Sequence, residues 1–181
     1  MIRLFVFPLC VFFILNVSLL AGAEKHALIL CGSGGQEEYR ETFQTWATRL
    51  QRVLTEKCGF SVEDTVLVVS QPRVLDASPS FRNQVTSEFE RLQTRVTPSD
   101  SLFIFLIGHG SYINQQSKFH VHGQDLTADQ FAAWLEPIQS GPIVLINTTA
   151  ASAGFINQLS AAQRIVCTAV KSVDESNATE F

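Results

Sequence analysis

Short apolar runs alternate along the chain with longer amphipathic segments, and this alternation restricts the possible folds more than any other feature. The run DSLFIFLIG at residues 100–108 is apolar at consecutive positions, which is typical of a central strand buried on both faces of a parallel sheet. Similar runs that predict further strands lie at residues 26–32, 64–70, 141–147 and 164–170. Strands that alternate with helices imply right-handed crossovers. The sequence therefore predicts an α/β protein with a mostly parallel sheet covered on both faces.

Amphipathic segments predict the helices between these strands. Residues 37–57 carry apolar side chains at helical spacing, and Gly59 follows as a stop signal. A second helix is expected to open at Pro79 and to close at Pro98. Its predicted buried face consists of Phe81, Val85, Phe89, Leu92 and Val96.

A third helix has the clearest predicted boundary. Thr127 and Gln130 have the spacing of a capping box, and Leu126 and Phe131 are placed to form a hydrophobic staple around it. Just before this helix, the run KFHVHG at residues 118–123 is expected to form a short hairpin arm.

The first 23 residues have the pattern of a secretory signal. Arg3 is followed by a long apolar run, and residues 21–23 read Ala-Gly-Ala, which predicts cleavage before Glu24. An uncleaved membrane anchor is the alternative, but the run is shorter than the roughly 20 residues that a spanning helix needs. We therefore expect an exported protein, in the periplasm, the extracellular space or the secretory pathway, with no stable membrane anchor. Residues 24–181 are long enough for one domain.

Charge and cysteine content exclude several functions. The formal net charge is -4, and no basic stripe is present, so nucleic acid is not an expected partner. Cys10 leaves with the signal, and Cys31, Cys58 and Cys167 are too few for a disulfide framework. Cys31 and Cys167 lie in predicted strands and are expected to be buried. No cysteine pair has metal-ligand spacing, and we expect no metal and no cofactor.

Two predicted strands end in segments with features of a reaction site. His109 follows the third strand between Gly108 and Gly110, and the fourth strand ends in the small residues of VLINTTAASAGF (144–155) before a helix. Ligands of parallel sheets bind beyond the carboxyl ends of the strands. Backbone N–H groups at a helix start favour developing negative charge, and an imidazole can activate a nucleophile there. The alternatives are an ordinary loop histidine and a tight turn of small residues.

The ordered set GSGGQEEYRETF, GHG, ASAGF and TAVKSVDESNATEF resembles the legumain family of caspase-fold cysteine peptidases over essentially all of residues 26–181. This resemblance implies a caspase-like three-layer α/β/α sandwich. In the family core another helix and strand follow, so we expect the domain to be truncated after Phe181.

The resemblance also assigns roles to individual residues. His109 matches the catalytic histidine, and the backbone amide of Gly110 matches an oxyanion-hole donor. Arg40 resembles the arginine that lines the pocket for a substrate Asn or Asp, because its planar donors suit an amide or carboxylate. Ser176 resembles a serine of the same pocket. An ordinary surface arginine and a solvated loop serine are the alternatives.

The chain departs from this family at the nucleophile. The family motif is C-x-S-G, and counting back from Ser152 puts Ala150 at the cysteine position. Counting forward from the end of the strand puts Thr149 there instead, and Ala151 replaces the family's acidic residue. An alanine methyl group cannot attack a carbonyl. The small residues thus keep the space of a nucleophile loop without its thiol.

Three functions follow as hypotheses. The leading one is an exported pseudopeptidase that is catalytically inactive and binds a peptide or protein ligand in a substrate-like pocket. The rival is an active hydrolase that cleaves after Asn or Asp, using Thr149, Ser152 or Cys31 with His109 as base. The third is a purely structural exported domain. The sequence specifies neither the ligand nor the oligomeric state.

Overall fold

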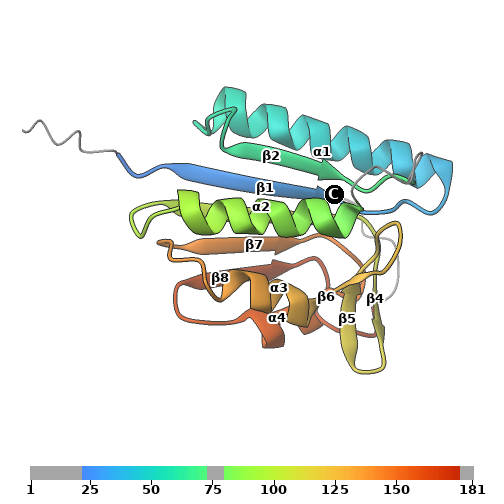
Figure 1. The fold of residues 1–181 in the computed structure, drawn as a ribbon. Helices are drawn as coiled ribbons and strands as arrows, with labels where there is room; N and C mark the ends of the chain where they lie inside the picture. Colours follow the sequence, from blue (N-terminus) through green and yellow to red (C-terminus); the bar gives the residue numbers. More distant parts are fainter. Residues whose placement is uncertain (1–21, 73–79, 176–181) are drawn as a thin grey trace, which may run out of the picture.

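The strands and helices follow one another largely as predicted. A computed structural model of the protein describes residues 22–72 and 80–175 (Figure 1). In chain order its elements are β1 (Lys25–Cys31), α1 (Glu37–Lys57), β2 (Thr65–Val69), α2 (Phe81–Arg95), β3 (Ser101–Ile107), β4 (Gly110–Ile113), β5 (Gln116–Phe119), β6 (Leu126–Thr127), α3 (Ala128–Leu135), β7 (Ile143–Asn147), α4 (Gly154–Leu159) and β8 (Arg164–Thr168).

The main sheet has the strand order β2-β1-β3-β7-β8, and every pair of neighbours is parallel. The most apolar strand, β3, lies at its centre, as its consecutive apolar residues predict. Helix α1 covers one face, and α2, α3 and α4 cover the other (Figure 1). The predicted three-layer α/β/α sandwich is confirmed.

Alternation along the strands feeds two separate apolar cores. Leu28 and Leu30 of β1 point into a core with α2, α3 and α4, in which Phe89 stacks on Trp134 at a centroid distance of 5.0 Å. Ile29, which lies between them in the strand, packs with Phe43 of α1 on the other face. Every residue predicted for the buried face of the second helix is buried. Both faces of the sheet are thus fixed by the two-residue period of the strands.

The hairpin is the main correction to the predicted elements. It forms earlier than expected, from β4 and β5, and β6 joins them in a small antiparallel sheet. Its turn residues, Asn114 and Gln115, have φ of 52° and 61°, the left-handed conformation that a two-residue hairpin turn requires. Of the predicted arm, only Lys118 and Phe119 lie in a strand. The hairpin therefore begins directly after His109.

Two further predictions need correction. The second helix begins at Phe81, where the Ser80 side chain accepts a hydrogen bond from the Asn83 amide, and it ends at Arg95 rather than at Pro98. Pro79 lies outside the described residues. Cys167 is exposed rather than buried, because β8 is an edge strand whose face on the α1 side is left open. Ile165 on that same face is 54% exposed.

The predicted leader falls almost entirely outside the described residues, since residues 1–21 are not among them. Within the described ranges, no helix combines the length and the apolar character needed to cross a bilayer.

The capping box at α3 provides a test of the fold. The Thr127 side chain accepts from the Gln130 amide, and the Gln130 side chain accepts from the Thr127 amide, as predicted. We expect Thr127→Ala to lower the free energy of unfolding by about 1 kcal/mol, because it removes one of these bonds. Chemical denaturation measures the change. Thr48→Ala, at an exposed position inside α1, is the control and should change stability by less than about 0.5 kcal/mol. Equal effects of the two substitutions would contradict the role of the box.

Candidate functional site

The pairing of β3 with β7 brings the two segments that follow these strands to one end of the sheet. The register runs from Leu102 opposite Ile143 to Leu106 opposite Asn147. Beyond it, both the backbone N–H and the hydroxyl of Thr148 donate to the Leu106 carbonyl, at 3.0 and 2.7 Å. The His109 segment and the small-residue segment therefore leave the sheet side by side.

Gly110 makes the closest approach between the two segments. A Cβ atom at this position would clash with Thr149 Oγ1 and would lie 2.6 Å from the Ala150 carbonyl oxygen. Only glycine fits there, because any other residue would push the two segments apart. The residue matched to the oxyanion hole thus contacts both residues matched to the nucleophile position.

The imidazole of His109 packs against two neighbouring aromatic rings of α1, Tyr39 and Phe43, whose centroids are 6.0 Å apart. The ring centroids of Tyr39 and Phe43 are 5.0 and 4.9 Å away, with interplanar angles of 73° and 77°. These are edge-to-face contacts, which hold the imidazole plane in one orientation. The helical spacing of apolar side chains over residues 37–57 did not distinguish these two rings from the others, and Tyr39 is 37% exposed. The sequence did contain one signal for this contact: Tyr39 and Phe43 are spaced by about one helical turn, at the start of the helix that follows the first strand.

Burial lowers the pKa of His109, and a hydrogen bond to the Gly34 backbone partly opposes the shift. The nearby charge of His120 lowers the pKa further. A histidine whose pKa is lowered by folding binds its proton more readily in the unfolded chain, so its contribution to stability falls as the pH drops below about 6.5. At neutral pH the imidazole is neutral and can accept a proton or a hydrogen bond.

The small-residue segment forms a bend held by its own polar groups. The Thr149 amide donates to the Asn147 side chain at 3.0 Å, and Ala151 has a left-handed φ of 52°. The Ala151 amide donates to the Glu175 carbonyl at 2.8 Å. Ala150, at the position matched to the cysteine, is 7% exposed and presents only a methyl group. The bend that the resemblance matches to a nucleophile loop thus has an inert side chain at position 150.

The three alternative nucleophiles are poorly placed for attack. The Thr149 hydroxyl is fully buried and donates to the Ala150 carbonyl at 3.2 Å. Ser152 is also fully buried. Burial raises the pKa of Cys31 to about 12, so its thiol is almost never ionised at neutral pH. None of these side chains has the exposed, activated character of a catalytic nucleophile.

Several buried polar atoms around the bend have no hydrogen-bond partner within the described part of the chain. They are Ser117 Oγ, Asn147 Nδ2, Ser152 Oγ and Glu175 Oε1. Ser117 is counted among the atoms around the bend because its hydroxyl lies against Gly154. Buried polar groups normally find a partner in water, protein or ligand. Because these atoms are buried, an internal water molecule can satisfy them, whereas a ligand at the surface does not reach them.

Arg40 lies at the same end of the sheet. Gly34, whose backbone bonds to His109, packs directly against the Arg40 backbone. The Arg40 guanidinium pairs with Glu37 in the first turn of α1, and both side chains are well exposed. Ser176 lies outside the described residues, although Glu175 just before it reaches the bend. The structure thus gathers His109, Gly110, Thr149, Ala150, Ser152 and Arg40 at one end.

An apolar groove of about 420 Å³ continues from this cluster along α1. It lies between α1 and the open part of the sheet, and Trp46 at its side contacts Phe43 at a centroid distance of 5.9 Å. Its apolar lining consists of Trp46, Leu50, Val53, Phe105, Ile107 and Ile146. A groove of this kind suits apolar side chains of a ligand held near His109.

Comparison with known proteins gives no assignment: no family model matches the chain, and no curated protein matches it.

Thiol reactivity tests whether Cys31 can act as the nucleophile. Cys58 and Cys167 are exposed, and Cys31 is 1% exposed with its raised pKa. In a chain that starts at Glu24 and so lacks Cys10, we expect two thiols of the native protein to react quickly with Ellman's reagent and the third to react only on unfolding. Cys58→Ser and Cys167→Ser should each remove one fast thiol, and Cys31→Ser should remove none. Fast modification of Cys31 in the native protein would restore it as a candidate nucleophile.

Proposed function

We propose that the protein is an exported, catalytically inactive homologue of the legumain-type caspase-fold peptidases, which binds a peptide or protein ligand beside His109. One observation carries this proposal: Gly110 contacts Thr149 and Ala150, so that the histidine segment and the nucleophile bend share one site. The α/β/α fold and the α1 aromatic pair that packs against the imidazole agree with it.

The lack of a nucleophile supports inactivity. Acyl transfer to the enzyme needs a thiol or hydroxyl that can be ionised beside a base. The side chain at position 150 is a methyl group, and the hydroxyl of Thr149 is bonded to a backbone carbonyl. Losing the nucleophile of a peptidase removes nearly all of its rate acceleration but leaves the binding groups intact.

The groups that remain favour a ligand with an Asn or Asp side chain. Arg40 offers a planar set of donors that suits a carboxylate or amide. Its present partner, Glu37, is an exposed neighbour in the same helix, and such a pair is worth little. Glu37 can therefore be exchanged for a ligand carboxylate at low cost. The neutral imidazole and the groove along α1 provide further polar and apolar contacts.

The leader-like residues 1–23 support export and cleavage before Glu24. The active-hydrolase alternative would require Thr149, Ser152 or Cys31 to leave its buried position. The structural-domain alternative accounts for the contact between Gly110 and the bend by strand register alone, so peptide binding is what separates it from the proposal.

Peptide binding without cleavage is the direct test. We expect peptides with a central Asn or Asp to bind the exported protein in fluorescence polarisation, and to be intact by mass spectrometry after prolonged incubation. Arg40→Ala should weaken binding roughly tenfold, because it removes a charged hydrogen-bonding partner. Arg52→Ala, at an exposed site further along α1, is the matched control and should leave binding unchanged.

Two outcomes would contradict the proposal. Cleavage that His109→Ala abolishes would show an active hydrolase. Failure of every Asn or Asp peptide to bind, at concentrations up to the millimolar range typical of weak binding, would leave only the structural role.

A further inference from the structure

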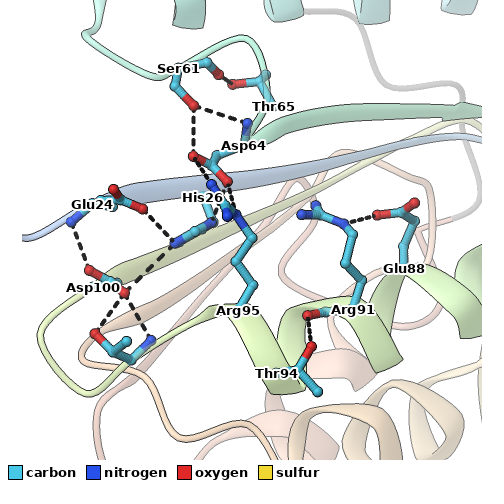
Figure 2. Close-up of polar contacts among 11 residues, drawn as sticks. Glu24, His26, Ser61, Asp64, Thr65, Glu88, Arg91, Thr94, Arg95 and Asp100 are labelled. Carbon is cyan, nitrogen blue, oxygen red and sulfur yellow. Dashed lines mark hydrogen bonds and ion pairs between the residues drawn. The ribbon is translucent and has the colours of Figure 1, made fainter.

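The end of the sheet opposite His109 holds a cluster of charged side chains around His26 (Figure 2). His26 lies on β1 and is fully buried. Its Nδ1 is 3.3 Å from Asp64 Oδ1. Its Nε2 is 3.8 Å from Asp100 Oδ2 and 3.9 Å from Glu24 Oε2. Neither ring nitrogen makes a hydrogen bond within the described part of the chain. Three carboxylates thus surround one buried imidazole.

Two of these carboxylates are held firmly in their charged form. Arg95 from α2 donates to both oxygens of Asp64, at 2.6 and 3.2 Å. This contact lowers the pKa of Asp64 to about 2. Asp100 accepts from the backbone and hydroxyl of Thr97, at 2.8 and 2.7 Å. Its burial raises the pKa, but these bonds and one from the Glu24 backbone outweigh it and lower the pKa.

The cluster therefore contains more negative than positive charge. Glu24, Asp64 and Asp100 contribute three negative charges, and Arg95 contributes one positive charge. Even a protonated His26 leaves one negative charge in excess. Glu63, an exposed neighbour of Arg95, adds to this excess. Glu24 is 54% exposed, so water solvates its carboxylate, and Asp64 is already paired with Arg95. Buried carboxylates are costly unless they are paired. Buried Asp100 has no cation within hydrogen-bond distance in the described part of the chain, so a further cation would stabilise it.

We propose that removal of the leader supplies this cation, in the form of the new amino terminus at Glu24. The inference rests on the cleavage site of the proposed exported protein. The backbone nitrogen of Glu24 already donates to Asp100 Oδ1 at 2.8 Å. A signal peptidase adds one water across the Ala23–Glu24 peptide bond, which leaves a carboxylate on Ala23 and an amine on Glu24. That amine takes up a proton at neutral pH.

Cleavage thus changes a neutral donor into a charged one without moving it. The new positive charge then lies within hydrogen-bond distance of the buried Asp100 carboxylate. A hydrogen bond between two charged groups is roughly twice as strong as a neutral one. The new pair ties the start of β1 to the start of β3, the central strand. The processed protein is therefore more stable than its precursor.

A divalent metal ion is the competing cation, because Glu24, His26 and Asp64 could together provide three ligand atoms. The contacts favour the ammonium. Asp64 is already occupied by Arg95, and both oxygens of Asp100 accept hydrogen bonds. A metal would have to displace the guanidinium, whereas the Glu24 nitrogen is already in place.

The test compares chains that differ only at the amino terminus. The first is the exported protein, with a mass that places its start at Glu24. The second retains Gly22 and Ala23, and the third starts at an acetylated Glu24; both keep the N–H donor but not the charge next to Asp100. We expect the processed chain to melt about 3–8 °C higher than the other two, from one charged hydrogen bond in a domain of this size.

Two substitutions separate this pair from general charge effects. Asp100→Asn should reduce the difference between the processed and extended chains to less than about 1 °C, because it removes the partner. Glu63→Gln, at the exposed neighbouring carboxylate, should retain the full difference. If Asp100→Asn does not fold, the acetylated chain still isolates the charge without any substitution.

Each remaining outcome counts for or against the inference. Equal melting temperatures of the processed and acetylated chains would overturn it. So would Zn²⁺ raising the melting temperature of the extended chain in a way that Glu24→Gln abolishes, since the missing cation would then be a metal. A mass that places the start elsewhere than Glu24 would refute the cleavage site. The proposed function is tested separately, by peptide binding beside His109.

Discussion

The parallel pairing of β3 with β7 determines where the candidate site forms. Because the two strands run in the same direction and in register up to Leu106 and Asn147, the segments that follow them must leave the sheet together. Gly110 then allows the two backbones to approach so closely that a Cβ atom would clash. The meeting of His109 with the bend around Ala150 is therefore a consequence of strand order and register. This geometry depends on the backbone packing of the two segments and not on the side chain at position 150.

The two ends of the sheet differ in their chemistry. At the carboxyl end, His109, whose pKa is lowered by burial, lies close to the bend around Ala150, and an apolar groove runs along α1. At the amino end, Asp64 and Arg95 form a bidentate pair, and Asp100 accepts several hydrogen bonds. The first arrangement suits a ligand, and the second fixes the strand starts. Strand starts that are fixed at the amino end also hold the opposite end of the sheet, where the candidate site lies. One face of β8 is nevertheless open.

Local patterns in the sequence predicted the fold well, and contacts between distant segments could not be predicted. The apolar residues of β3 identified the central strand, and the capping box located the start of α3. The hairpin was predicted too late in the sequence because its turn, Asn114-Gln115, lacks the glycine that usually marks such turns. Cys167 was misjudged because only the strand order shows that β8 is at an edge.

For the candidate site, the sequence identified the residues of both loops but not their surroundings. The aromatic contacts of Tyr39 and Phe43 with His109 could not be predicted, because helical spacing does not show which side chains reach a loop. The charge cluster was invisible for a similar reason, since Glu24 and Asp100 are separated by 76 positions.

Restoring a thiol at position 150 tests the central claim most directly, namely that His109 and the nucleophile bend form one site. In Ala150→Cys, the pH dependence of alkylation at this position, resolved by mass spectrometry, reports the ionisation of the introduced thiol. With His109 present, we predict a midpoint below the ordinary thiol value of about 8.5, because a nearby imidazole takes the proton and stabilises the thiolate. Adding His109→Gln should return the midpoint to about 8.5 or above. The same pH profile with and without His109 would show that the two segments do not act together, and would contradict the account.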